Sequence, residues 1–137
     1  MILMYVDSKE REEAVRRVAG SIGERVSVIG PGELPLKLSE IIKKNTVSGG
    51  LTPELLKPLP FQITPPAESK VPPMYQMPEI LIFVSIEEEG IRTFLSGFRA
   101  EGEKPVALKA AVTPFNINWT LYSLIGELRR EREALHG

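Results

Sequence analysis

Two runs of consecutive apolar residues, at residues 2–6 and 80–84, predict two buried β-strands. Strands covered on both faces carry apolar side chains at every position, whereas half-exposed strands alternate. Two other runs do alternate, at residues 26–28 and 106–112. The pattern therefore predicts two central strands and two strands nearer the edges of one sheet. Lys109 would place a charge on an edge strand, where it discourages pairing with a second sheet.

Helix signals follow each buried strand at equivalent places. Asp7 and Ser85 each stand three residues before a glutamate, which fits a helix N-cap with an acidic third residue. Gly23 and Gly102 stand where each helix would end. Between these signals, apolar residues recur at helical spacing. They are Val15, Val18, Ala19 and Ile22 in the first stretch, and Ile91, Phe94, Leu95 and Phe98 in the second.

The order of these elements is the same in the first and last thirds of the chain, which predicts two copies of a β-α-β-α unit. The second helices match in pattern: Leu36, Leu38, Ile41 and Ile42 against Trp119, Leu121, Leu124 and Ile125. With right-handed crossovers, the copies joined through their buried strands give an α/β fold. We predict a four-stranded, mostly parallel sheet of order 2-1-3-4 with helices on both faces. Residues 1–137 would form one domain, with units at residues 1–44 and 79–135.

The connection between the two units, residues 45–78, holds eight of the twelve prolines. Proline at this density excludes sustained helix and interior strand. Its apolar residues, among them Leu51, Phe61 and Tyr75, are unlike those of a free linker, which would be more polar. We expect this segment to pack on the body of the protein or to exchange between two protomers of a homodimer.

Composition excludes several classes of function. Lysine and arginine number 17 against 18 acidic residues, and this balance predicts neither nucleic acid nor a membrane surface as a partner. The chain has no cysteine, which removes disulfides and zinc–thiolate sites and suits a cytoplasmic protein. The single histidine, His136, lies next to the C-terminus, so a histidine triad or metal site is not expected. Neither nucleotide-binding glycine motif is complete, and we predict no cofactor and no metal.

A binding site is expected where the strand order changes direction. Doubly wound sheets bind ligands outside the carboxyl ends of their strands at such a switch point. Asp7, Ser8, Ser85 and Ile86 follow the two buried strands. Asp7 and Ser85 are therefore candidate ligand-binding residues, although each also fits a simple helix cap.

The segment from Lys109 to Thr120 is the second candidate region. Thr113, Asn116, Asn118 and Trp119 lie between a predicted strand and the last predicted helix. Turn and cap roles account for these residue types, with Asn118 or Thr120 as the helix cap. Alternatively, a helix N-terminus beside two amides and an indole could hold an anionic or planar ligand. Both interpretations remain open at this point.

This segment also resembles a known family. Lys109, Ala110, Thr113, Asn116, Trp119 and Thr120 match a K-A-x-x-T-x-x-N-x-x-W-T pattern, followed by Glu127 and Leu128 in a helix. The pattern is similar to that of the bacterial domain-of-unknown-function family 3783, over roughly residues 79–135. The resemblance implies an α/β fold and carries no activity with it.

The sequence therefore predicts a cytoplasmic α/β domain that binds a small ligand or a protein partner at the strand ends and is not an enzyme. One alternative is a small enzyme that uses Asp7 or a glutamate near Thr113, in a pocket joining Asp7, Ser85 and Asn116. The other is a homodimeric interaction protein that assembles through its proline-rich segment.

Overall fold

The computed structural model describes residues 1–45 and 76–136, and these residues form two compact units. One unit comprises Met1–Gly30 and Met77–Ala111, and the other comprises Pro31–Gln76 and Val112–Gly137. We call them the sheet unit and the helical unit. The division cuts across both predicted repeats, because each repeat contributes its first three elements to one unit and its last helix to the other. The packing predicted for residues 45–78 falls almost entirely outside the described residues.

The sheet unit contains four strands in the predicted order. They are β1 (Ile2–Tyr5), β2 (Val26–Val28), β3 (Ile80–Phe83) and β4 (Leu108–Ala111), arranged β2-β1-β3-β4. β1 pairs with β2 in parallel, and β3 pairs with β4 in parallel. The prediction of an α/β fold with a mostly parallel sheet of order 2-1-3-4 is therefore confirmed.

The central pair of strands runs in opposite directions. β1 and β3 are antiparallel, with Ile2 opposite Phe83 and Tyr5 opposite Ile80. The binding site expected at the switch point required these two strands to run in parallel, and this expectation is wrong. Their predicted burial is correct, since the side chains of both strands are almost completely buried, apart from Tyr5. The antiparallel pairing decides where the strand ends lie.

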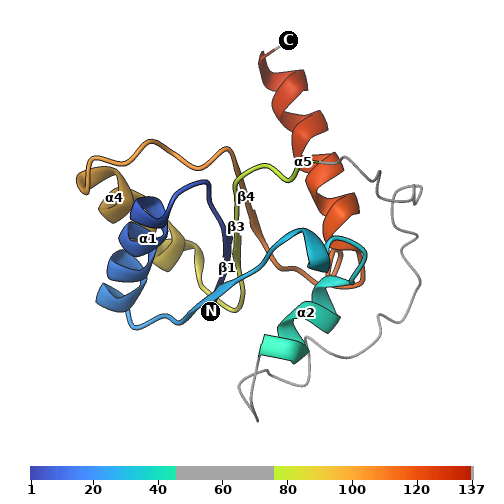
Figure 1. The fold of residues 1–137 in the computed structure, drawn as a ribbon, viewed down its shortest axis with the longest axis horizontal. Coiled ribbons are helices and arrows are strands. Elements are labelled where there is room, and N and C mark those ends of the chain that lie inside the picture. The colour runs from blue at the N-terminus through green and yellow to red at the C-terminus, as the bar shows by residue number, and fades with distance from the viewer. Residues whose placement is uncertain (46–75, 137) are drawn as a thin grey trace. The chain divides into compact units, whose positions relative to one another are not determined.

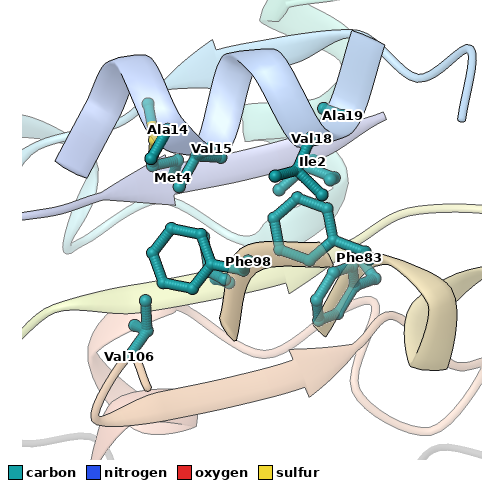
Figure 2. Packing of buried hydrophobic residues seen from close by; sticks show 11 residues of the cluster. Ile2, Met4, Ala14, Val15, Val18, Ala19, Phe83, Phe98 and Val106 are labelled. Atoms are coloured by element: carbon teal, nitrogen blue, oxygen red, sulfur yellow. The ribbon is translucent and has the colours of Figure 1, made fainter. Parts of the chain in front are cut away.

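The helices α1 (Lys9–Ser21) and α4 (Glu88–Ala100) lie beside each other on one face of this sheet (Figure 1). Figure 2 shows the side chains of α1 and those of Phe83 and Phe98 pointing into one apolar layer. Phe94 packs edge-on against Phe83 and stacks with Phe98. Gly97 brings the two helices together, because a Cβ atom at this position would lie 2.9 Å from Val18 Cγ1.

The helix ends follow the predicted signals at the C-terminus and depart from them at the N-terminus. Gly23 and Gly102 follow α1 and α4 with φ angles of 76° and 85°, as expected for glycines that end helices. The N-cap of α1 is Ser8, whose hydroxyl accepts from the Arg11 N–H, and not Asp7. The N-cap of α4 is Glu87, without a side-chain bond, and not Ser85. Both caps were therefore predicted too early in the sequence.

The helical unit is assembled from two similar segments. One contains the short 3-10 helix η1 (Pro31–Glu33) and α2 (Leu38–Asn45), and the other leads into α5 (Leu121–His136). Lys37 and Thr120 form an antiparallel bridge between them. The core of this unit includes Leu34, Leu38, Ile41, Ile42, Ile117, Leu121, Leu124 and Ile125. The members of the predicted apolar stripes that lie within α2 and α5 are thus buried, whereas Leu36 and Trp119 precede these helices and are half-buried.

Backbone hydrogen bonds across this bridge are reciprocal. Leu38 N donates to Trp119 O, and Leu121 N donates to Leu36 O, each at 2.9 Å. A further pair joins Ser39 to Ile117 and Tyr122 to Leu34 at 2.9 and 3.0 Å. Positions 36 and 119, and positions 38 and 121, are those that the sequence pattern aligns. Such reciprocity is what a duplicated unit predicts, and the duplication itself stays a prediction.

Candidate functional site

Asp7 lies at the end of β1, beside the start of β3. Its backbone N–H donates to Glu79 Oε2 at 2.8 Å, and its side chain is exposed. The same carboxylate receives two hydrogen bonds from the Arg11 guanidinium, at 2.8 and 3.0 Å. Asp7 is therefore placed by an ion pair that fixes the start of α1 against the start of β3.

Arg11 has several further contacts in this cluster. Its guanidinium donates to Lys104 O at 3.0 Å and lies 5.6 Å from the centre of the Phe98 ring. The Arg11 and Glu79 side chains are 16% and 13% exposed, so the pair is largely withdrawn from water. The Glu79 carboxylate and the Arg11 guanidinium together join α1, the start of β3 and the segment before β4. We therefore assign Arg11 and Glu79 to stability, a role that their spacing in the sequence did not indicate.

Ser85 lies at the opposite end of the sheet from Asp7. It follows β3, where Val84 N donates to Met1 O, whereas Asp7 lies beside Glu79 at the other end of the same strand. The shared switch-point cleft that was expected between Asp7 and Ser85 is therefore not formed. The pocket that the enzyme alternative requires fails for the same reason, since antiparallel strands place their carboxyl ends apart.

Ser85 has an unusual backbone conformation. Its φ angle is 56°, in the left-handed region that residues other than glycine adopt infrequently. Its side chain is exposed. The chain bends at Val84 and Ser85 as it leaves β3. We therefore interpret Ser85 as a residue with a structural role in this bend.

We predict that Ser85→Gly raises the free energy of unfolding by about 0.5 kcal/mol, because glycine adopts a positive φ without steric cost. Urea denaturation measures the change. Ser85→Ala is the matched control: it also removes the hydroxyl but keeps the Cβ atom, so it should not stabilise the protein. Equal effects of the two substitutions would show that the backbone conformation is not the cause.

In the helical unit, Thr113 and Asn116 close a turn on each other. Thr113 N donates to Asn116 Oδ1 at 2.8 Å, and the N–H groups of Phe115 and Asn116 each lie 3.2 Å from Thr113 Oγ1. Ile117 N and Trp119 N continue the hydrogen bonding, with Thr113 O and Asn116 O as their acceptors. The turn interpretation of Thr113 and Asn116 thus describes how these side chains are used. We call residues 113–119 the turn loop.

The turn loop presents an aromatic side chain to solvent. Phe115 is 61% exposed, and Pro114 and Asn118 are also exposed. Phe115 was not among the residues selected from the sequence. The signal that could have found it is its place between Thr113 and Asn116, because turn residues that bond to each other direct the residues between them outward. Asn118, a candidate ligand residue, makes no cap, and Thr120 has that role: its hydroxyl accepts from Ser123 N at 3.1 Å.

Trp119 is half-buried, and its indole Nε1 has no hydrogen-bond acceptor among the described residues although the atom itself is buried. A buried donor without a partner costs about 1–3 kcal/mol. The ring therefore stabilises the fold through its apolar surface, and its unpaired N–H group reduces this stabilisation.

We predict that Trp119→Phe changes the free energy of unfolding by less than about 1 kcal/mol, because the lost ring area is offset by removal of the unpaired donor. Trp119→Ala removes the apolar area as well, and we expect it to cost about 2–3 kcal/mol, less than a fully buried aromatic residue. Urea denaturation of both variants provides the comparison. If phenylalanine proved as damaging as alanine, the indole N–H would have to be bonded in the native protein.

One comparison with known proteins concerns the family resemblance of the C-terminal part of the chain. Residues 79–135 match the family model described as Domain of unknown function (DUF3783), which confirms the resemblance. No curated protein and no solved structure matches the chain. Within the described residues, no group of three or more His, Cys, Asp or Glu side chains could hold a metal ion. No helix in the described part of the chain has the length and apolar character that crossing a membrane requires.

Proposed function

We propose that this chain is a non-catalytic protein-binding domain, that its turn loop makes the contact and that Phe115 is the anchor. The observation that carries the proposal is the 61% exposure of Phe115 on a turn closed by its own side chains. Aromatic residues that fill a partner's pocket supply much of the energy of protein interfaces. The absence of cysteine from the chain suits the cytoplasm as the compartment.

The closed turn supports the proposal through entropy. Ordering a loop when a partner binds costs free energy, and a loop that is already held loses less. Thr113 Oγ1 and Asn116 Oδ1 hold the backbone on both sides of Phe115. An isolated exposed phenylalanine needs no functional explanation, but its position on a fixed turn makes it suitable for recognition.

The same hydrogen bonds favour a protein partner over a small polar ligand. The oxygen acceptors of Thr113 and Asn116 already receive backbone N–H groups of the loop. A small ligand would have to replace these internal bonds before it could use the two side chains. The exposed groups that remain are the Phe115 ring, Pro114 and Asn118, which suit a partner with an apolar pocket and a polar rim.

Site-specific photo-crosslinking tests the proposal. A photoreactive phenylalanine analogue at position 115 should give one major crosslinked partner in the native host, to be identified by mass spectrometry. The matched control carries the analogue at Val28, which is also an exposed apolar residue at 49% exposure. Crosslinking at position 115 should fall strongly when Asn116→Ala opens the turn.

Binding of the identified partner to purified protein then decides the question. Phe115→Ala should weaken the affinity at least about tenfold, which corresponds to about 1.4 kcal/mol, while leaving the urea denaturation curve unchanged. The proposal is wrong if the Val28 position gives the same crosslinks, or if Phe115→Ala leaves the affinity unchanged.

A further inference from the structure

Both compact units are built from the two ends of the chain. We define residues 1–45 as the N-terminal half and residues 76–136 as the C-terminal half. The N-terminal half supplies β1, α1 and β2 to the sheet unit, and the C-terminal half supplies β3, α4 and β4. The helical unit takes η1 and α2 from one half and α5 from the other. Neither half therefore completes a unit by itself.

In the sheet unit, the two halves meet at the centre of the sheet. The antiparallel pairing of β1 with β3 joins one half to the other, and without it both buried strands would become exposed edges. The apolar cluster is shared in the same way, since Met4 and Val15 pack with Phe94 and Phe98. Among the described residues, three ion pairs cross between the halves: Arg11 with Glu79 and with Glu103, and Arg17 with Glu101.

In the helical unit, the halves are joined by the reciprocal hydrogen bonds around Lys37 and Thr120. Each of these four bonds has its donor in one half and its acceptor in the other. A half-chain without its partner would leave these backbone groups unpaired. None of these contacts between described residues requires that the two halves belong to the same polypeptide.

We propose that the contacts between the two halves also form between two copies of the chain, so that the N-terminal half of one protomer assembles with the C-terminal half of the other. The product is a closed, two-fold symmetric dimer that repeats the described contacts between the halves, and exchange of identical elements is a low-cost route to such dimers. The connection at residues 46–75 has only to be long enough, and about 30 residues can extend up to ~100 Å.

Protein concentration during folding selects between the two forms. The covalent connection gives the intramolecular halves an effective concentration of the order of millimolar or below. Dilute refolding therefore yields the single-chain form, and the exchanged dimer grows as the protein concentration during folding approaches that value. Conversion between the two forms afterwards is slow, because the contacts of both units have to be broken first.

A pair of complementary chains tests the proposal. One full-length chain carries Val18→Ala and the other carries Gly97→Ala, with a different affinity tag on each. In the exchanged heterodimer, both changed positions fall in one sheet unit, where the smaller side chain makes room for the added methyl group. The other sheet unit is then identical to the native one. Each chain alone retains either a cavity or a clash at this contact.

The two chains are unfolded together, refolded at high concentration, and analysed by sequential tag purification and light scattering. We expect a species that carries both tags, has twice the 15.2 kDa chain mass, and exceeds each homodimer by at least about tenfold. The control pair is Gly20→Ala with the unchanged chain, because a Cβ atom at Gly20 meets no neighbour. That pair should mix at random.

A second pair of variant chains keeps the test decisive if the Gly97→Ala chain does not fold. Arg17→Glu on one chain and Glu101→Arg on the other reverse an exposed ion pair of 2.7 Å, where substitution leaves the core intact. Opposite charges face each other in both sheet units of the exchanged heterodimer, whereas like charges face each other in each single chain. Single-chain species at every concentration, or random mixing with both complementary pairs, would overturn the proposal.

Discussion

Gly97→Ala is expected to lower the free energy of unfolding by about 2 kcal/mol, although alanine is the better helix former. The added Cβ atom would lie 2.9 Å from Val18 Cγ1, closer than a normal contact. Valine is restricted at χ1 in a helix, so Val18 cannot move aside without strain. Overpacking of a well-filled core typically costs about 1–3 kcal/mol, which exceeds the gain of up to ~1 kcal/mol in helix propensity. Urea denaturation measures the difference.

Gly20→Ala is the matched control for this prediction. Gly20 lies in α1, the other helix of this pair, and an added Cβ atom meets nothing within 4 Å. Here only the propensity changes, and we expect stabilisation by about 0.5–1 kcal/mol. Combining Gly97→Ala with Val18→Ala in one chain should cost less than the sum of the single changes. Stabilisation by Gly97→Ala alone would show that the two helices do not approach this closely.

The elements of the fold could be predicted from the sequence where a strand or helix is buried on one face or on both faces. The continuous apolar runs gave the central strands, and the alternation at Leu108 and Lys109 matches an outer strand whose side chains are alternately buried and exposed. Gly23 and Gly102 marked helix ends because glycine adopts a positive φ easily. These signals are local, and each has a direct physical cause.

The direction of the central strand pair could not be predicted in this way. When both faces of a strand are buried, parallel and antiparallel pairing bury the same side chains, so the pattern of Ile2 to Tyr5 is consistent with either. The choice depends on long-range contacts such as Glu79 with Asp7 and Arg11. The expected cleft required parallel central strands, so the antiparallel pairing excludes it.

The turn loop shows a different limit. Thr113 and Asn116 were recognisable as turn residues, and their hydrogen bonds have the local geometry expected of such residues. The sequence could not tell whether their oxygens were available to a ligand, because the same atoms serve both purposes. The place of Phe115 between Thr113 and Asn116 indicates that it points outward, but how much of its ring is exposed depends on the packing of the helical unit.

Glu79→Ala is expected to lower the free energy of unfolding by about 2 kcal/mol. The change removes both hydrogen bonds of the Arg11 guanidinium to the carboxylate and the acceptor for Asp7 N. Breaking a buried ion pair by removing one partner costs about 3–5 kcal/mol. The value here should be lower, because both side chains retain some exposure. Glu79→Gln should lose less, since an amide oxygen can still accept from Asp7 N.

Glu101→Ala provides the control, because it removes a carboxylate that also pairs with an arginine of α1. The Arg17–Glu101 distance of 2.7 Å is as short as the 2.8 Å between Arg11 and Glu79, but the side chains are 60% and 35% exposed. Exposed pairs contribute about 0–1 kcal/mol, so Glu101→Ala should have little effect. The two pairs differ in their withdrawal from water and in the number of backbone groups that they hold. If urea denaturation gave equal losses for both substitutions, the network around Arg11 would contribute no more than an ordinary surface pair.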